Sequence, residues 1–365
     1  MFALVTTKTS SFSSSAVANA SRRTPRSFLV NYLTRILGFS KTVAAATSKN
    51  LPNLKSADRP DRVLSFLCSS GFSQTHIRDA VRIAPQVLVA DVEKILKPKV
   101  KLFQGLGLEG SDLGLFLSKN STLLTISLDR KLIPCINVLK SVLSRNDRVI
   151  TALRNCRWIL CKDPSARLLP NIAFLQSCGI VGSQLSTLLQ RLPFLFAMKE
   201  SALHALVGRV KGMGFSVDSR MFVYALQTVS SMKPETLQQK LKLFEAFGFS
   251  KEESMAAFRS APSLLRTSEK KLRLGLEFFL NTVEVDRATL VRTPRYLMYS
   301  LEERVIPRTR VVEMLTRKKL WEKPSLAYAI DVPEVQFLLK YILRFGDEAD
   351  ELLAAYKGVV LTSPA

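Results

Sequence analysis

The sequence predicts an all-α protein, a solenoid of helical repeats about 35 residues long, and three observations lead to this prediction. Prolines recur every 36 residues, at Pro98, Pro134 and Pro170. A second series of positions lies 13 residues upstream, at Pro85, Ser121 and Arg157, and continues to Pro193. No segment shows a sustained alternation of apolar and polar residues, so strands are not expected. A repeat of this length is one supersecondary unit that stacks on its neighbours.

The first part of each repeat is an apolar helix that ends in glycine and a large apolar residue. The pairs are Gly71-Phe72, Gly107-Leu108, Gly179-Ile180, Gly214-Phe215 and Gly248-Phe249. Glycine ends helices because it adopts the left-handed conformation without steric cost. One repeat lacks this glycine, in the segment 144–147.

A second helix follows, and serines mark its expected start. We expect N-caps near Ser73, Ser111, Ser183 and Ser250, and Ser250 with Glu253 has the spacing of a capping box. This helix should stop at the first proline series, because proline disfavours helical geometry in the residue before it.

An apolar pair such as Val87-Leu88 or Leu264-Leu265 comes next, followed by a short polar segment. The second proline series then opens the next repeat. Proline at the first position of a helix loses no hydrogen bond, so Pro98, Pro134, Pro170 and Pro307 are expected there.

Charge and composition divide the chain into four parts. Residues 1–27 resemble a transit peptide, since residues 1–57 contain no acid and eight basic residues among many hydroxyl residues. Residues 28–59 are expected to form an N-terminal helical extension, 60–310 the repeat array and 311–365 the C-terminal capping helices. The leader favours a mitochondrial location, with the chloroplast as the alternative. Five irregularly spaced cysteines fit a reducing compartment.

The net charge of +23 favours a polyanionic partner. Nucleic acid and an anionic membrane surface both fit, but no basic amphipathic helix is evident outside the leader. No apolar stretch is long enough to span a bilayer, so membrane insertion is not expected. The polar segments between repeats and the basic C-terminal third supply the candidate nucleic-acid contacts: Arg130, Lys131, Lys199, Arg259, Arg266, Lys270, Arg292, Arg295, Arg304, Arg308 and Arg310.

Motifs for catalysis or cofactor binding are weak. The run Gly105 to Gly110 matches a dinucleotide-binding pattern, but it follows a predicted helix and not a strand. Two histidines and scattered cysteines do not make a zinc pattern. We therefore expect no enzyme activity, no cofactor and no metal. The aromatic residues Trp158, Phe194, Phe196 and Phe222 have the chemistry to stack on bases, but their spacing favours the core.

Two C-terminal segments carry a family resemblance. Arg292 to Arg308, RTPRYLMYSLEERVIPR, and Phe337 to Gly358 resemble the last repeat and the closing helix of the mitochondrial transcription termination factor (mTERF) family, most closely its plant branch. The resemblance covers about residues 60–358. It implies a curved superhelix of two-helix repeats with a short third helix, organellar DNA or RNA bound in a basic groove, and a role in organellar transcription or RNA processing. We expect a monomer, with other gene-expression proteins as further partners. The alternative is a protein-interaction scaffold that does not bind nucleic acid.

Overall fold

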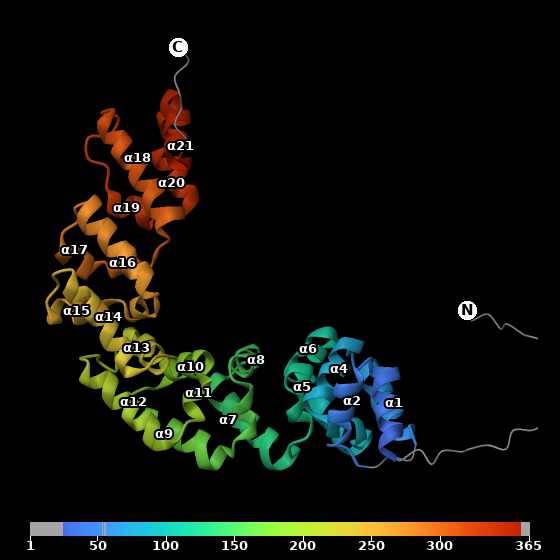
Figure 1. The fold of residues 1–365 in the computed structure, drawn as a ribbon. Coiled ribbons are helices and arrows are strands. Elements are labelled where there is room, and N and C mark those ends of the chain that lie inside the picture. The colour runs from blue at the N-terminus through green and yellow to red at the C-terminus, as the bar shows by residue number, and fades with distance from the viewer. Residues whose placement is uncertain (1–24, 53, 55, 359–365) are drawn as a thin grey trace, which may run out of the picture. The chain divides into compact units, whose positions relative to one another are not determined.

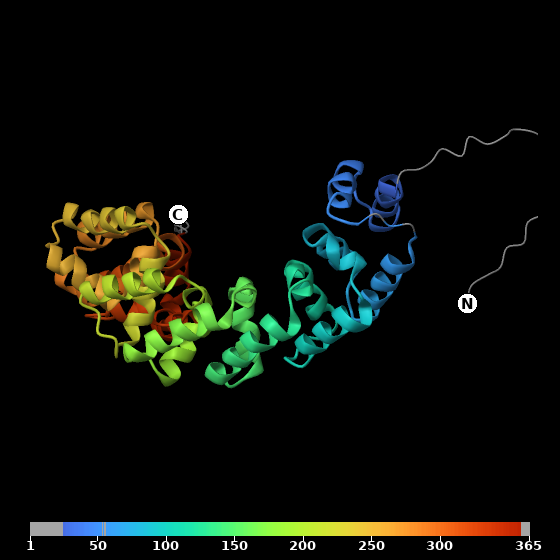
Figure 2. The same cartoon turned by 90° about the horizontal axis from the view of Figure 1, so that it is seen from below.

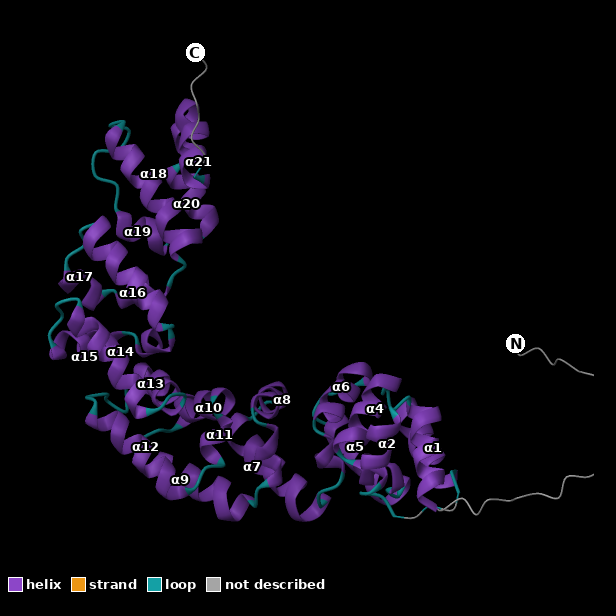
Figure 3. Cartoon of the chain, in the orientation of Figure 1, coloured by secondary structure: helices purple, strands orange, loops and turns teal. Residues whose placement is uncertain are grey.

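The computed structural model describes residues 25–52, 54 and 56–358. Helices and loops make up all of this part of the chain, and no strand occurs in it, which confirms the all-α prediction (Figure 3). The predicted transit peptide, residues 1–27, lies outside the described residues except where the first helix begins at Pro25. No helix in the described ranges has the length and apolarity that crossing a bilayer requires.

The chain forms two compact units, Met1–Asp163 and Pro164–Ala365. The α-helices of the first unit are α1 (Pro25–Leu37), α2 (Lys41–Ser48), α3 (Asp58–Ser69), α4 (Gln74–Ile83), α5 (Lys97–Gln104), α6 (Gly110–Lys119), α7 (Ile133–Leu143) and α8 (Asn146–Asn155). Its 3-10 turns are η1 (Pro85–Val89), η3 (Ser121–Leu124) and η5 (Arg157–Cys161), and its π turns are η2 (Val92–Leu96) and η4 (Leu128–Leu132).

The second unit contains α9 (Leu169–Ser177), α10 (Gly182–Arg191), α11 (Pro193–Phe196), α12 (Glu200–Gly212), α13 (Arg220–Ser230), α14 (Pro234–Ala246), α15 (Lys251–Ser260), α16 (Glu269–Glu277), α17 (Arg287–Arg292), α18 (Ile306–Arg317), α19 (Leu326–Asp331), α20 (Glu334–Tyr341) and α21 (Ala349–Lys357). Its shorter turns are η6 (Pro164–Leu168), η7 (Pro262–Arg266), η8 (Phe278–Thr282), η9 (Pro294–Met298), η10 (Leu301–Val305) and η11 (Leu343–Glu348).

Successive repeats stack within each unit. Second helices pack on second helices, as in α4 on α6 and α15 on α17, and first helices do the same, as in α14 on α16. The 3-10 turn packs against its own repeat, as η1 does against α3 and α4. Inside each unit the chain therefore passes from one repeat to the adjacent one along the stack (Figures 1 and 2).

The glycine turns form where the sequence predicts them. Gly71 has a φ of +93°, and a β-carbon at this position would lie 2.6 Å from the backbone of Gly110 in the next repeat. In the repeat without the glycine, Ser144 takes the left-handed conformation, with a φ of 60°. The turn is thus kept in that repeat, at the steric cost of a β-carbon.

The second helices begin only partly as predicted. Ser73 and Ser250 are N-caps, and each forms a capping box with the residue three positions later. Ser111 and Ser183 are not, because α6 begins at Gly110 and α10 at Gly182, one residue earlier than each serine. The helices end before the first proline series as predicted, with C-caps at residues such as Ala84 and Ala261.

The prolines of the second series lie in the first turn of their α-helices, at the second position and not at the first as predicted, and a π turn directly precedes each helix. Pro98 lies in the second turn of a helical segment that begins at Val92 with the π turn η2. The same arrangement holds at Pro134, Pro170 and Pro307, whereas α12 and α16 lack the proline and begin without a π turn. Proline in a helix removes a hydrogen bond and clashes with the preceding turn. The wider π turn accommodates the proline ring without breaking the helix.

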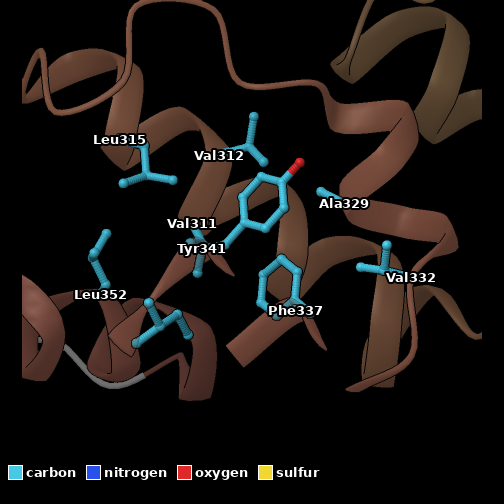
Figure 4. Close-up of a cluster of buried hydrophobic side chains, with 9 residues drawn as sticks. Val311, Val312, Leu315, Ala329, Val332, Phe337, Tyr341 and Leu352 are labelled. Atoms are coloured by element: carbon cyan, nitrogen blue, oxygen red, sulfur yellow. The ribbon is translucent and has the colours of Figure 1, made fainter. Parts of the chain in front are cut away.

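The apolar pairs that follow the first proline series form the core. Val87, Leu88, Leu264 and Leu265 are all fully buried. At the C-terminal end, helices α18 to α21 enclose their own cluster around Phe337 and Tyr341 (Figure 4). The rings of these two residues stack with centroids 5.1 Å apart.

Candidate nucleic-acid interface

In several repeats, one side chain of the first helix donates a hydrogen bond to the next repeat. The residue that follows each second-series proline donates to backbone carbonyls of the following short turn. Lys99 Nζ donates to Leu124 O at 2.6 Å, and Asn171 Nδ2 donates to Phe196 O at 2.9 Å. The thiol of Cys135 is directed at Lys162 O at 3.5 Å. We call these side chains the inter-repeat donors, and together with Arg308 they bind the carbonyl groups of η3, the end of η5, α11 and the end of α19.

Arg308 is the inter-repeat donor of the last repeat. It is fully buried, and its Nη1 donates to Ala329 O and Val332 O at 2.7 and 2.6 Å. Its Nη2 forms an ion pair with Glu334 at 2.7 Å. The sequence predicts that Arg308 contacts nucleic acid, which is wrong in this structure. Its guanidinium is buried and hydrogen-bonded to protein groups, so it is not accessible to a ligand.

The guanidinium groups of three further candidates form hydrogen bonds or ion pairs with protein groups. Arg304 donates from Nε to Ile330 O and from Nη2 to Val332 O, both at 2.8 Å. Arg295 forms an ion pair with Asp331, and the hydrogen bond from Arg295 holds the pKa of Asp331 below its ordinary value. Arg259 forms an ion pair with Glu252. Of these three, Arg295 remains exposed while Arg304 and Arg259 are half-buried.

The other seven candidates keep their charged groups available. Arg130, Lys199, Arg266, Lys270, Arg292 and Arg310 are exposed, and Lys131 is half-buried. Within the described residues, none of the seven forms an ion pair with a carboxylate. Their positive field is therefore not neutralised by neighbouring acids in direct contact.

Two of these cations, Lys199 and Lys270, and the further lysine Lys233 lie at the N-terminal ends of first helices. Lys199 and Lys233 occupy the N-cap positions of α12 and α14, and Lys270 lies in the first turn of α16, whose N-cap is Ser268. The N-terminal end of a helix carries a partial positive charge and free N–H groups. Equivalent positions of stacked repeats lie on the same side, so these lysines face one side of unit 2. The first turn of each of the three helices also carries a glutamate: Glu200, Glu235 or Glu269.

Unit 1 repeats part of this arrangement. Lys94 and Arg130 are each the third residue after an N-cap, Asp91 and Ser127, whose side chains accept from the backbone N–H groups of Lys94 and Arg130. Beside Lys94, a surface hollow of about 530 Å³ is lined by Arg59, Arg62, Ser65, Phe66, Ala90, Asp91, Val92 and Glu93. The hollow has basic and acidic groups on its wall, so it lacks the uniform charge of a dedicated phosphate site.

The aromatic candidates differ in how far they are buried. Phe196 and Phe222 are fully buried and Phe194 is half-buried, as the spacing predicted. Trp158 differs, because 41% of it is exposed. The glycine run from Gly105 to Gly110 connects α5 to α6, so it lies between two helices and not after a strand.

The inter-repeat donors were not identified from the sequence. Lys99, Asn171 and Lys271 resemble ordinary surface residues in a basic chain, and Lys271 donates to Met298 O at 2.7 Å. A signal was present, however, since Lys99, Cys135, Asn171 and Arg308 all follow a second-series proline directly. A polar residue that recurs at the same position of each repeat, on a helix face that is otherwise apolar, indicates a hydrogen-bond partner in the protein interior.

Comparisons with known proteins agree with this architecture. The model of the mTERF family matches residues 64–273 and 129–338. The chain is 22% identical over 253 residues to a protein of Arabidopsis thaliana named transcription termination factor MTERF8, chloroplastic. The alignment covers 69% of this chain and 49% of that protein, so the chain spans about half the length of the curated relative it matches.

Proposed function

This chain belongs to the mTERF family, and from that premise we propose that it binds organellar nucleic acid and regulates organellar gene expression. The observation that carries the proposal is the set of exposed cations without acidic partners at the helix ends of successive repeats. Arginine and lysine in such a row neutralise successive phosphates, which supplies affinity without base specificity. Contacts to bases would supply the choice of target.

The proposed location is a plant organelle. The family and the acid-free leader support an organelle, and the Arabidopsis relative is named as chloroplastic. The basic leader by itself favours the mitochondrion. Import of the radiolabelled chain into isolated chloroplasts and mitochondria, with protease protection as the readout, decides between the two.

A salt titration tests nucleic-acid binding. Mobility-shift measurements with a duplex and with a single strand of the same sequence should show binding to at least one of them. The slope of log affinity against log salt should correspond to several phosphates, at about −0.9 per phosphate for a duplex and about −0.7 for a single strand. A chain that binds neither strand form at about 50 mM salt is not a nucleic-acid-binding protein.

A protein-interaction scaffold is the second candidate, and one observation favours it. Val335, Leu339 and Leu343 form an exposed apolar row along α20 and η11, with 67, 56 and 56% of each residue exposed. Apolar rows of this kind mark protein contacts more often than nucleic-acid contacts. The same titration discriminates, because a scaffold should bind neither the duplex nor the single strand.

A further inference from the structure

Unit 1 contains a tryptophan that is exposed to solvent. Trp158 is the second residue of the 3-10 turn η5, and 41% of it faces solvent. Large aromatic side chains contribute most when they are buried, so an exposed indole in a stacked repeat is unusual. Among the exposed large hydrophobic side chains of the described residues, most are aliphatic, and Trp158 and Tyr328 are the aromatic ones.

Sister repeats show that the fold does not require an aromatic residue here. The equivalent second residue of the short turn is Gln86 in η1, Thr122 in η3 and Arg295 in η9, and all three are exposed. The backbone of the turn thus directs this position to solvent in these three repeats, whereas the equivalent Ser263 in η7 and Phe194 in α11 are half-buried. The repeat at η5 alone among these four places an indole there, which points to a ligand and not to packing.

One cation lies over the indole, and the element that carries two more is packed against its turn. Lys162 Nζ lies 5.7 Å from the centroid of the Trp158 ring. The π turn η4, which carries Arg130 and Lys131, packs directly against η5. The Sγ of Cys135, four residues after Lys131, lies 3.5 Å from the backbone oxygen of Lys162, so the first turn of α7 lies against the end of η5.

Two carboxylates occur nearby in the chain: Asp129 lies within η4, and Asp163 comes two residues after η5. Three cations against two acids leave the cluster positive. Successive bases of a single strand stack on aromatic rings while their phosphates contact nearby cations. A duplex keeps its bases stacked inside the helix and offers no free base face along its length.

We propose that Trp158, with Lys162, Arg130 and Lys131, forms a stacking site for an unpaired nucleobase. This inference rests on the proposed function and adds the substrate class: unpaired nucleotides, in RNA or in single-stranded DNA. The indole stacks on the base, and the three cations contact the flanking phosphates.

The chain contains two tryptophans, Trp158 and Trp321, which makes a direct optical test available. In the full chain with Trp321→Phe, Trp158 is the single fluorescent indole. Single-stranded RNA, single-stranded DNA and duplex of one sequence are titrated in parallel, with mobility shifts recorded on the same samples. Saturating single strand should quench Trp158 strongly and duplex should not, and the stronger of the two single-strand responses identifies RNA or DNA.

A matched pair of substitutions gives the second readout. Trp158→Leu keeps an apolar side chain but removes the ring, and should weaken single-strand binding about five- to hundredfold while duplex binding changes less than twofold. Tyr328→Leu is the control, because Tyr328 is an equally exposed ring (44%) with a lysine, Lys340, 4.1 Å from its centroid. It should leave both affinities unchanged.

The outcomes separate the two proposals. Binding without quenching of Trp158, or equal weakening of single strand and duplex by Trp158→Leu, overturns the stacking site and leaves the proposed function intact. Absence of binding to any nucleic acid overturns both. The quenching measurement leaves Trp158 itself unchanged, so it stands even where Trp158→Leu fails to fold.

Discussion

The ammonium group of Lys99 lies 2.6 Å from the carbonyl oxygen of Leu124, one repeat further along the chain, and only 4% of Lys99 is exposed. A buried cation without an acidic partner is costly, so its hydrogen bond has to offset part of that cost. The equivalent Asn171 and Arg308 also donate to carbonyls of the following short turn. Side chains of this series join each repeat to the next, and this determines which cations remain available to a ligand.

Removing the first inter-repeat donor should weaken unit 1. Lys99→Met keeps most of the side-chain volume but leaves Leu124 O without a partner, and we expect a loss of about 1 kcal/mol in the free energy of unfolding at neutral pH. Urea denaturation followed by circular dichroism measures it. Lys101→Met is the control, since Lys101 is exposed on the same helix. An equal loss in both variants contradicts the role of Lys99.

The same comparison should depend on pH. Burial lowers the pKa of Lys99 below its ordinary 10.5, so the folded chain binds fewer protons than the unfolded chain between the two values. Stability contributed at this site therefore rises with pH across that window. The difference in unfolding free energy between the natural chain and Lys99→Met should grow from neutral pH towards about 10.5. A difference that stays constant or shrinks over that range shows that Lys99 is not desolvated.

Glycine should stabilise the repeat that lacks it. Ser144 has a φ of 60°, where a β-carbon is unfavourable, so Ser144→Gly is expected to raise stability by about 1 kcal/mol. The reverse test is Gly71→Ala, whose β-carbon would meet the backbone of Gly110 at 2.6 Å and should destabilise strongly. Thermal unfolding of both variants gives the signs. If Ser144→Gly lowers the melting temperature, the hydroxyl and not the backbone determines this turn.

Arg308 and Arg310 lie two residues apart on α18 and should behave oppositely. Arg308→Met removes a buried guanidinium that binds carbonyls and Glu334, and should cost about 3 kcal/mol of stability. Arg310→Met alters an exposed side chain, and should change stability by less than about 0.5 kcal/mol. Denaturation curves measure stability, and mobility shifts test whether Arg310→Met alone weakens nucleic-acid binding in a chain that remains folded.

These cases show what local sequence can predict. Glycine turns and proline-terminated helices followed from the sequence because each depends on the backbone preferences of a few adjacent residues. Lys99 and Arg308 did not, because their partners lie more than 20 residues away and charge alone does not distinguish a buried donor from a surface contact. The spacing of Trp158 favours the core, whereas its position in the short turn leaves it 41% exposed.

The two ends of helix α12 provide the sharpest test of the proposed interface. Lys199 is the N-cap and Lys211 lies in the last turn, and both are exposed. Lys199→Glu and Lys211→Glu change the net charge of the chain equally, so any difference in binding reflects position and not the overall field. Lys199→Glu removes a cation from the row of helix N-termini, and should weaken binding and reduce the salt slope by about one phosphate.

Lys199→Glu should bind more weakly than Lys211→Glu but should be the more stable variant of the two, so the effects on binding and on stability can be told apart. A carboxylate at the N-terminus of a helix is favourable and one at the C-terminus is unfavourable, each by about 0.3–1 kcal/mol. Weaker binding by Lys199→Glu therefore cannot result from loss of folding, because this variant should be the more stable of the two. If Lys211→Glu weakens binding as much, or if neither variant changes the salt slope, phosphates do not contact this end of α12 and the proposed row of helix ends is not the interface.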